Sequence, residues 1–490
     1  MDIFLVDHDY KYAAEQMLLC LFPEERPVYP EAPTGNDSVT LTLRRGGKYA
    51  LCLALLRRNG IVSRGEARVS LARLTDPLAE ARLLQRIVKL AFYRAALHGG
   101  YDAPVWGSLT GVRPGKLFSS LLREGMTERQ AVGSFMRDFG VSAERTELCR
   151  ETVRRSQAAR ELLQPGDVCL YIGIPFCPTR CAYCSFVSLE AAGSLKLMPV
   201  YLDALEQELA AVAGAVRLSG SRVAAVYIGG GTPTTLSAAQ LRRLCSLTRE
   251  LFDLSACREF TVEAGRPETV TEEKLTALRD CGVTRLSINP QTMSDEVLQA
   301  IGRRHSVQDI YSAMALVRQL GGFELNMDLI AGLPGDTPES FERSVREVIA
   351  FSPENITVHT LALKKGSRFL ADGSAALPDG DAVGEMLDRA NTLLRAGGYG
   401  PYYLYRQKFM SGSYENVGWT LPGRDNLYNI CIMEELCHIL SVGAGGSTKL
   451  ISSAGAVQRL SVPKYPREYA ARIESVCREK AELAALLRQR

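Results

Sequence analysis

Three cysteines in one short stretch, Cys177, Cys181 and Cys184, have the residue type and the spacing to bind a metal. They form a C-x3-C-x2-C array directly after an apolar run over residues 168–174, which is typical of a β-strand. Pro175 cannot continue the hydrogen-bond ladder of a strand, so we expect the cysteines to lie on the loop beyond it. Three thiolates on one loop repel each other unless they share a cation or a metal cluster.

A zinc ion and an iron–sulfur cluster are the two candidates for this array. A structural zinc ion normally has four protein ligands, and the loop contains no fourth Cys or His. A four-iron cluster usually takes four cysteines, so three cysteines leave one iron open for a ligand that is not protein. The array therefore favours a four-iron, four-sulfur cluster over zinc.

The composition indicates a globular protein of two or three domains, because the chain has 490 residues of which 46% are hydrophobic. The net charge of +3 gives no bulk attraction to nucleic acid. The amino terminus is too acidic for a signal peptide, and no apolar run is long enough to span a membrane. We therefore expect a cytoplasmic protein whose other cysteines are buried thiols, with neither nucleic-acid binding nor a membrane span.

Residues 1–150 are predicted to form a separate α+β domain. Alternating residues around Gly46-Gly47 predict a β-hairpin, to which residues 66–74 add a third strand. Helical periodicity is present over residues 77–98, 115–124 and 127–139. The glycines and proline before Lys116 resemble a phosphate-binding loop, but Thr110 and Leu117 occupy its essential glycine and hydroxyl positions. A turn before a helix is the favoured interpretation, and a contact with the catalytic domain through Arg113 is the alternative.

From about residue 165 to 375 strand and helix patterns alternate six times, which predicts an α/β fold with parallel strands and right-handed crossovers. Ligands of such sheets bind beyond the carboxyl ends of the strands. Candidate binding groups occur there: a Gly229–Thr232 turn after the second strand, Glu263 at the end of the third, and Asp328 inside the fifth. The predicted strands cover residues 168–174, 223–228, 259–264, 284–289, 323–330 and 355–361, with helices such as 200–218 and 338–351 between them.

The cysteine array, with Tyr171 before it and Tyr183 inside it, resembles the radical S-adenosylmethionine (SAM) superfamily and, within it, the oxygen-independent coproporphyrinogen III oxidase group. The resemblance implies a six-stranded partial TIM barrel over residues 165–375. It also implies one 4Fe-4S cluster on the three cysteines, with SAM on the open iron. In that superfamily an electron from the cluster cleaves SAM to a 5′-deoxyadenosyl radical.

The same resemblance implies which residues bind SAM. The glycine turn would hold its amino group, Arg303 its carboxylate, Asp328 its ribose hydroxyls and the Ala362 backbone its adenine. Two local departures from the family pattern are Gly265-Arg-Pro267 in place of Asn-Pro, and Asn289-Pro290 in place of Gly-Val. The implied cofactor-binding set is Tyr171, Tyr183, Gly230, Gly231, Thr232, Glu263, Gln291, Arg303, Asp328 and Ala362.

Residues 385–490 are predicted to form an α-rich extension that covers the substrate. Motifs in residues 402–408, 422–429 and 442–447 resemble the carboxy-terminal region of the same group and indicate its long HemZ branch. The candidate substrate contacts are Arg406, Lys408, Arg424 and Lys449 for propionates and Tyr403 or Tyr405 for a pyrrole, with surface salt links as the alternative. Of two isolated histidines, His359 in the sixth strand is interpreted as a core group rather than a catalyst, and His438 is placed in a helical stretch.

The resemblance implies oxygen-independent decarboxylation of coproporphyrinogen III to protoporphyrinogen IX in haem biosynthesis, with a one-electron donor such as flavodoxin or ferredoxin. Two positions depart from the known patterns. Phe186 stands where proven oxidases carry a further cysteine and resembles the related haem chaperones, whereas Asp425-Asn-Leu-Tyr428 lacks the histidine of the chaperone motif. A haem chaperone and a radical SAM enzyme for another tetrapyrrole are therefore the alternatives.

Overall fold

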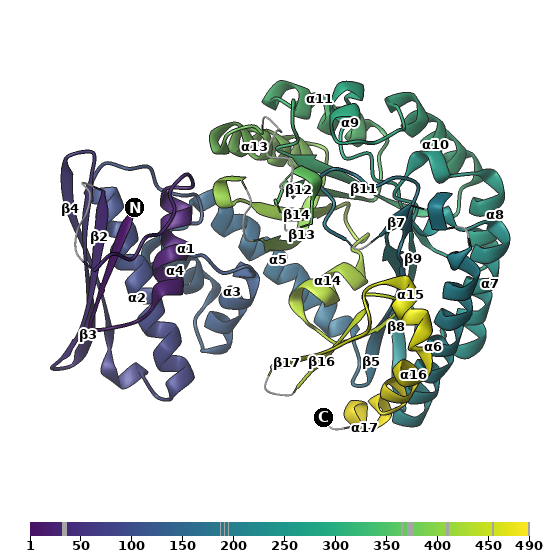
Figure 1. The fold of residues 1–490 in the computed structure, drawn as a ribbon, viewed down its shortest axis with the longest axis horizontal. Helices are drawn as coiled ribbons and strands as arrows, with labels where there is room; N and C mark the ends of the chain where they lie inside the picture. Colours follow the sequence, from purple (N-terminus) through teal and green to yellow (C-terminus); the bar gives the residue numbers. More distant parts are fainter. Residues whose placement is uncertain are drawn as a thin grey trace. The chain divides into compact units, whose positions relative to one another are not determined.

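The computed structural model describes residues 1–31, 37–186, 188–190, 192–194, 196–363, 366–369, 377–407, 411–452 and 455–488. It contains two compact units (Figure 1). The smaller unit comprises Met1–Arg150 with Gly412–Tyr414, and the larger one comprises Glu151–Ser411 with Glu415–Arg490. A further division of the larger unit at about residue 380 stays a prediction.

A four-stranded sheet forms one side of the smaller unit, in the order β1-β2-β3-β4. The predicted hairpin is confirmed, because β2 and β3 pair antiparallel up to Gly46 and Tyr49. The third predicted strand exists but begins earlier, and its last predicted residues form a 3-10 turn instead. The parallel edge strand β1 was not predicted. The bounds are β1 Asp2–Val6, β2 Ser38–Gly46, β3 Tyr49–Arg58 and β4 Ile61–Ser70.

Helix α2 packs on this sheet and has the predicted bounds, Pro77–His98. Its amino terminus is fixed by Asp76, whose carboxylate accepts hydrogen bonds from two backbone amides of the first turn. A Cβ at Gly65 of β4 would lie 2.2 Å from the Ala91 carbonyl oxygen, so only glycine allows this close approach. The turn before Pro114 leads into a helix, as favoured above, whereas the role of Arg113 stays a prediction. The other helices are α1 Lys11–Leu21, α3 Pro114–Arg123, α4 Glu128–Phe139 and α5 Ala143–Leu162.

The larger unit contains the six predicted parallel strands, in the order β12-β11-β10-β9-β8-β5. Each strand pairs in parallel with its neighbour, which confirms the predicted α/β fold with parallel strands. Their near-continuous apolar sequences reflect burial on both faces. The bounds are β5 Asp167–Ile174, β8 Arg222–Gly230, β9 Glu259–Glu263, β10 Arg285–Ser287, β11 Glu324–Ala331 and β12 Asn355–Thr360.

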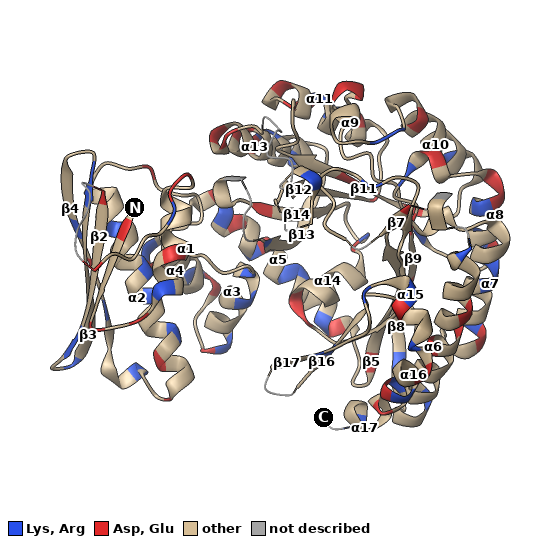
Figure 2. Cartoon of the chain, viewed as in Figure 1, with Lys and Arg blue, Asp and Glu red and all other residues tan. Residues whose placement is uncertain are grey.

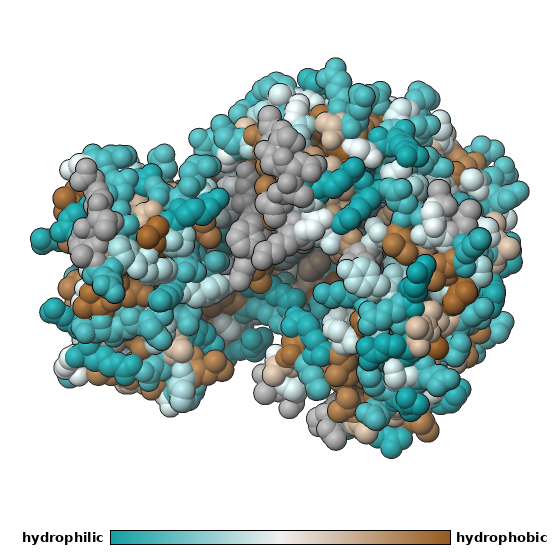
Figure 3. Space-filling model, viewed as in Figure 1, coloured by the Kyte–Doolittle hydropathy of each residue, from teal (hydrophilic) through white to brown (hydrophobic). Residues whose placement is uncertain are grey.

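Helices on the outside of these strands carry most of the charged residues coloured in this unit in Figure 2, while the strands are mainly uncharged. The face of the unit seen in Figure 3 is accordingly mostly hydrophilic, with apolar residues interspersed. Among the described residues, no helix is both long and apolar enough to cross a membrane. The helix bounds are α6 Leu197–Ser219, α7 Ala238–Leu251, α8 Glu272–Asp280, α9 Asp295–Ala300, α10 Val307–Leu320, α11 Pro338–Ala350 and α13 Gly380–Ala396.

The carboxy-terminal region contains helices, as predicted, but it also extends the sheet at both edges to eleven strands. Strands β13 and β14 join β12 antiparallel, whereas β15 pairs in parallel with β5 and is followed by β16 and β17. The prediction of a helix at His438 is wrong, because this residue begins β15 and pairs with Val168. The bounds are β13 Gly400–Arg406, β14 Glu415–Thr420, α14 Leu427–Glu434, β15 His438–Val442, β16 Ser447–Ile451, β17 Val457–Ser461, α15 Pro466–Ala471, α16 Ile473–Ala481 and α17 Leu483–Arg488.

Candidate active site

One pocket of about 480 Å³ lies at the carboxyl ends of the parallel strands. All of the cluster and cofactor residues that the sequence analysis predicted line it, although they come from six different strands and the loops after them. The set is Cys177, Cys181, Cys184, Tyr171, Tyr183, Gly230, Gly231, Thr232, Glu263, Gln291, Arg303, Asp328 and Ala362. The fold therefore brings the predicted residues together at the edge where α/β sheets bind ligands.

Backbone hydrogen bonds hold the start of the cysteine loop against the turn that follows β8. It begins at β6 (Phe176–Cys177), which pairs with β7 (Leu189–Glu190) and so closes the loop on itself. The Gly231 amide donates to the Ile174 carbonyl at 2.8 Å and the Thr232 amide to the Phe176 carbonyl at 2.7 Å. A Cβ at Gly231 would lie 2.6 Å from the Phe176 oxygen and 3.0 Å from Cys177 Sγ. Glycine is therefore required for the turn to lie this close to the first cysteine.

The three thiols differ in their electrostatic surroundings. Burial raises the pKa of Cys177 and of Cys184. Burial opposes ionisation of Cys181 too, but the guanidinium groups of Arg303 and Arg266 outweigh it and lower the pKa of this thiol. Arg266 Nη2 donates to Cys181 Sγ at 2.9 Å and to the Thr179 carbonyl at 2.8 Å. Cys181 is therefore the thiolate that the protein stabilises before any metal binds.

The three sulfur atoms of the cysteine loop are not as closely spaced as thiolates that share one zinc ion. Ligand sulfurs on a tetrahedral zinc ion lie about 3.8 Å apart, given a Zn–S bond of about 2.3 Å. Cys177, Cys181 and Cys184 do not form a group within 4.8 Å, although another cysteine trio among the described residues does. Cysteines of a four-iron cluster each bind a different iron, which requires wider spacing.

Glu263 lies at the end of β9 and is held by two donors. Tyr227 Oη donates to its Oε1 at 2.6 Å and the Gly230 amide to its Oε2 at 3.1 Å. Burial raises the pKa of Glu263 to about 7, and the nearby Asp328 carboxylate adds to the shift. The amides of Gly230, Gly231 and Thr232 thus all donate within the protein, which leaves carbonyl oxygens as the backbone groups that this turn offers a ligand.

Asp328 lies within β11 and faces the pocket with its carboxylate. Its Oδ1 accepts from Asn326 Nδ2 at 2.8 Å, and its Oδ2 is 3.7 Å from His359 Nε2. Gln291 lies beside it with a positive φ of 73°, and the Gln291 amide donates to the Asp328 carbonyl at 2.9 Å. A non-glycine residue in this conformation is strained, and the buried Gln291 Oε1 has no hydrogen-bond partner among the described residues. An unsatisfied acceptor here fits a donor supplied by a ligand.

Arg303 is buried and lines the same pocket as the cysteine loop. Its Nη2 donates to Tyr183 Oη at 3.1 Å and its Nη1 to the Asn289 carbonyl at 2.6 Å. Its Nε has no partner among the described residues. The neighbouring Arg304 is exposed to solvent.

Sequence reasoning missed three contributors to the pocket, Tyr227, Tyr428 and Arg266, whereas it included Tyr171. Tyr171, Tyr227 and Tyr428 stack, with 4.4 Å between the ring centroids of Tyr227 and Tyr428. Arg266 was noted only as a departure from the family pattern, yet it contacts a cluster cysteine. Tyr227 could have been found from the sequence, because side chains along a strand alternate between its two faces. Tyr428 could not, because it lies on α14 in a distant part of the chain.

The predicted propionate contacts do not gather in this pocket. Arg424 pairs with Glu324 at 2.7 Å. Glu324 begins β11, so this pair lies at the amino ends of the parallel strands, whereas the pocket lies at their carboxyl ends. Arg406 and Lys449 are not among the pocket-lining residues, and Lys408 lies outside the described residues. Tyr403 and Tyr405 do line the pocket, and Tyr405 Oη lies 3.4 Å from His359 Nδ1. His359 therefore faces the pocket instead of lying in the core.

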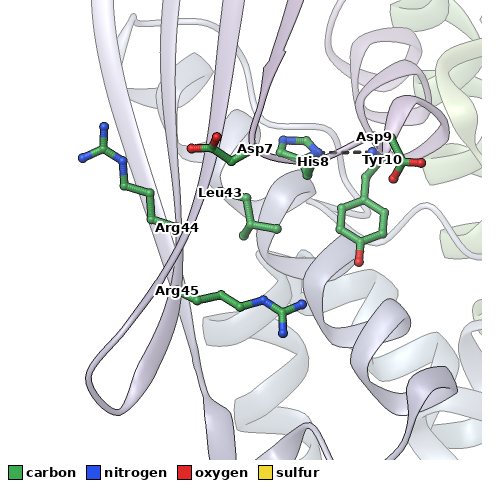
Figure 4. Close-up of a pocket in the computed structure, with 7 residues that line it drawn as sticks. All are labelled: Asp7, His8, Asp9, Tyr10, Leu43, Arg44 and Arg45. Atoms are coloured by element: carbon green, nitrogen blue, oxygen red, sulfur yellow. Dashed lines mark hydrogen bonds between the residues drawn. The ribbon is translucent and has the colours of Figure 1, made fainter.

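A second pocket, of about 500 Å³, lies in the smaller unit between the turn after β1 and strand β2 (Figure 4). His8 is at its centre, where Nδ1 accepts from the Tyr10 amide at 3.1 Å and burial lowers the pKa of the ring. The ring is also 3.1 Å from the Leu41 carbonyl through Nε2. Both ring nitrogens are thus engaged by the backbone, which indicates a structural histidine.

Six parallel strands, a three-cysteine loop at their carboxyl edge and a polar pocket beneath it define a radical SAM protein. The model of the Radical SAM superfamily matches residues 171–348.

Sequence identity to individual relatives shows to which family of radical SAM proteins the chain belongs. The chain is 40% identical over 380 residues to the oxygen-independent coproporphyrinogen-III oxidase-like protein HemZ of Bacillus subtilis, covering 76% of each chain. It therefore belongs to the HemZ branch of the oxygen-independent coproporphyrinogen-III oxidase-like family.

Two other relatives carry different functions in their names. The heme chaperone HemW of Bacillus subtilis is 34% identical over 238 residues, 47% of this chain and 61% of the chaperone. The solved structure of coproporphyrinogen III oxidase (HemN) from Escherichia coli, a radical SAM enzyme, matches with a TM-score of 0.51 and 26% identity over 66% of this chain and 73% of that one.

Proposed function

We propose that this chain is a radical SAM enzyme that decarboxylates coproporphyrinogen III to protoporphyrinogen IX without oxygen. The observation that carries this proposal is the single pocket that joins the three-cysteine loop to polar side chains at the carboxyl ends of six parallel strands. The family provides the reaction class, since an oxidase from Escherichia coli shares the fold. A one-electron donor such as flavodoxin or ferredoxin would supply the electron that reduces the cluster.

Cys177, Cys181 and Cys184 would hold a 4Fe-4S cluster, and the pocket beneath them would hold SAM. When bound, these two cofactors supply a 5′-deoxyadenosyl radical that removes a hydrogen atom from the β-carbon of a substrate propionate. The substrate would then lose carbon dioxide and pass one electron to an external one-electron acceptor, which leaves the vinyl group. The glycine turn supports this assignment, because a Cβ at Gly231 would contact the first cysteine. The unsatisfied Gln291 Oε1 and Arg303 Nε support it too, since each can bond to a polar ligand.

The polar residues of the pocket would orient SAM from several sides. Asp328 would accept hydrogen bonds from the ribose hydroxyls, because its carboxylate already lies in the pocket and is fixed by Asn326. Arg303 would pair with the methionine carboxylate through the part of its guanidinium that has no protein partner. Glu263 and the carbonyl oxygens of the Gly230–Thr232 turn would accept from the amino group.

The tyrosines of the pocket would contact the substrate and limit water. Tyr403 and Tyr405 lie on β13 with ring centroids 6.3 Å apart and present flat apolar surface for a pyrrole ring. His359 lies between Tyr405 and Asp328, within reach of either. It is placed to hold or accept a proton near the substrate, which makes it a stronger functional candidate than its sequence position suggested.

The direct experiment is anaerobic incubation of the reconstituted protein with SAM, a reductant and coproporphyrinogen III. Formation of the vinyl product together with 5′-deoxyadenosine supports the proposal. Cys177→Ala, Cys181→Ala and Cys184→Ala should each abolish both products, while Cys245→Ala, which changes a buried cysteine of α7, should not. Deoxyadenosine production that survives in the triple cysteine variant would refute the cluster assignment.

A haem chaperone is the second candidate function. The observation in its favour is Phe186, which is 66% exposed beside the cysteine loop and stands where the oxidases carry a further cysteine. Against it, Asp425 replaces the histidine of the chaperone motif and lies 3.5 Å from Arg155. Stoichiometric haem binding without turnover of coproporphyrinogen III would favour the chaperone, and turnover of a different tetrapyrrole would favour the third alternative.

A further inference from the structure

A second group of three cysteines lies in the larger unit, separate from the cysteine loop. The Sγ atoms of Cys169, Cys431 and Cys437 all lie within 4.8 Å of one another, and Cys169 and Cys437 approach to 3.6 Å. These are the closely spaced thiols mentioned above, and we refer to them as the thiol trio. Among the described residues, this is the one group of three or more Cys, His, Asp or Glu side chains with so short a separation.

Three separate elements bring the trio together. Cys169 belongs to β5, the strand that leads into the cysteine loop, and Cys431 lies on α14. Glu435 ends that helix with a positive φ of 54°, which turns the chain back so that Cys437 comes just before β15. The pairing of Ile439 with Cys169 then fixes Cys437 beside the strand. Distant parts of the sequence thus converge on one point.

The surroundings of the trio are apolar. Cys169 and Cys431 are fully buried, and Cys437 is half-buried, which gives the group one exposed side. Alanine and isoleucine side chains of the same core cluster, including Ala224, Ala225 and Ile439, pack around it. An apolar shell of this kind excludes water and strengthens metal–thiolate bonds.

We propose that the thiol trio is a binding site for one thiophilic d10 metal ion, either three-coordinate Cu⁺ or Zn²⁺ with water as its fourth ligand on the side of the half-buried Cys437. Soft thiolate ligands select these ions, and sulfurs that share a zinc ion lie about 3.8 Å apart, close to the separations in the trio. A four-iron cluster does not fit, because its cysteines each bind a different iron and must be farther apart. A disulfide would use two of the thiols and leave the third buried without a role.

The bound ion would tether α14 to the sheet. That helix carries Tyr428, which stacks on Tyr227 and Tyr171 in the floor of the candidate active site. Its amino terminus is already held by Glu259, which accepts from the amides of Leu427 and Tyr428 at 3.0 and 2.8 Å. The metal would hold the other end through Cys431. The site is therefore structural, and it does not depend on which tetrapyrrole the pocket binds.

The test is metal binding by the full-length protein, with iron counted separately from zinc and copper. The reconstituted protein is equilibrated with Zn²⁺, or with Cu⁺ under anaerobic conditions, against a competing chelator, and each metal is counted by mass spectrometry. One ion per chain is expected in one of the two arms, and that arm identifies the metal. Cys437→Ala is the main variant, because its half-buried position makes it the least disruptive to the fold. Since it removes a direct ligand, it should weaken binding by more than the roughly tenfold that loss of an outer-shell partner costs.

Two controls separate the trio from other thiols. Cys245→Ala removes a buried cysteine elsewhere and should leave the affinity unchanged. The triple Cys177→Ala, Cys181→Ala, Cys184→Ala variant should lose iron but retain the other metal. The metal should also raise the melting temperature of the wild type and of Cys245→Ala, but not that of Cys437→Ala.

Three results would overturn the proposal. The first is less than a tenth of an equivalent of either metal bound at micromolar free metal, in protein that circular dichroism shows to be folded. The second is unchanged binding in Cys437→Ala, or binding that disappears with the cysteine loop. The third is a native disulfide within the trio on peptide mapping, in protein that still takes up no metal after reduction.

Discussion

Arg266 Nη2 lies 2.9 Å from Cys181 Sγ, and the Arg266 side chain is only 3% exposed. Glu268 is 3.6 Å from the other side of this guanidinium and also pairs with His305 at 2.9 Å. If Cys181 binds the proposed cluster, a cation fixed in this way against its sulfur would stabilise the more negative, reduced state of that cluster. Arg266 is one of the residues that stand in place of the family's Asn-Pro.

Arg266→Gln should therefore lower the reduction potential of the cluster. Loss of one charge-assisted hydrogen bond, about 1.5–3 kcal/mol, corresponds to a shift of roughly 60–130 mV for one electron. The measurement is a redox titration followed by electron paramagnetic resonance. The exposed Arg304→Gln is the matched control and should leave the potential in place; an equal potential in both variants would show that Arg266 has no such role.

Asp328→Asn should weaken SAM binding by roughly 1.5–3 kcal/mol, because the neutral amide removes charge-assisted hydrogen bonds to the ribose. The cluster should stay intact, since Asp328 contacts Asn326 and His359 rather than the cysteines. Calorimetry gives the dissociation constant and iron analysis gives the cluster content. Asp280→Asn, on the surface of α8, is the control, and an unchanged SAM affinity in Asp328→Asn would refute the assignment.

The raised pKa of Glu263 should make the free energy of unfolding depend on pH. Its pKa is about 7 in the folded protein against an ordinary value of 4.5, so the unfolded chain loses this proton first as pH rises. The contribution of Glu263 to stability is complete below pH 4.5 and is lost as pH rises to 7. Glu263→Gln does not titrate, so its stability relative to wild type should increase by roughly 3 kcal/mol across that window.

The measurement is the free energy of unfolding of SAM-free protein at several pH values between 4.5 and 8. Glu273→Gln, on the exposed face of α8, should differ from wild type by the same amount at each pH. A difference between Glu263→Gln and wild type that stays flat with pH would contradict the raised pKa.

Much of the site was predictable because its residues follow strands. Residues such as Glu263 and Asp328 occur where buried apolar runs end or are interrupted, and the parallel arrangement then places them at one edge. The bounds of α2 were predictable for a local reason, since Asp76 and Pro77 specify the start of a helix.

The rest depends on contacts between distant segments. His438 was wrongly assigned to a helix because an apolar run of five residues has no decisive period, and only pairing with β5 makes it a strand. Tyr428 reaches the pocket through the packing of α14, and Arg424 reaches Glu324 at the opposite edge of the sheet through a turn before that helix. No local pattern shows where such a side chain will lie.

Phe186 separates the proposed oxidase from its alternatives. It is exposed, so Phe186→Cys should cost little stability. If the chain is an oxidase, this variant should keep SAM cleavage and change porphyrinogen turnover by less than about tenfold, or roughly 1.4 kcal/mol in barrier height. Anaerobic assays of both proteins give these rates. A variant that gains the activity from an inactive parent would show that Phe186 disables the oxidase chemistry.

The most direct test of the central claim follows the hydrogen that leaves the substrate. Coproporphyrinogen III carrying deuterium at the β-carbons of its propionates is incubated anaerobically with the reconstituted protein, SAM and a reductant. The proposed reaction predicts deuterium in the 5′-deoxyadenosine, detected by mass spectrometry, together with vinyl product and carbon dioxide. Unlabelled 5′-deoxyadenosine formed without vinyl product would contradict it.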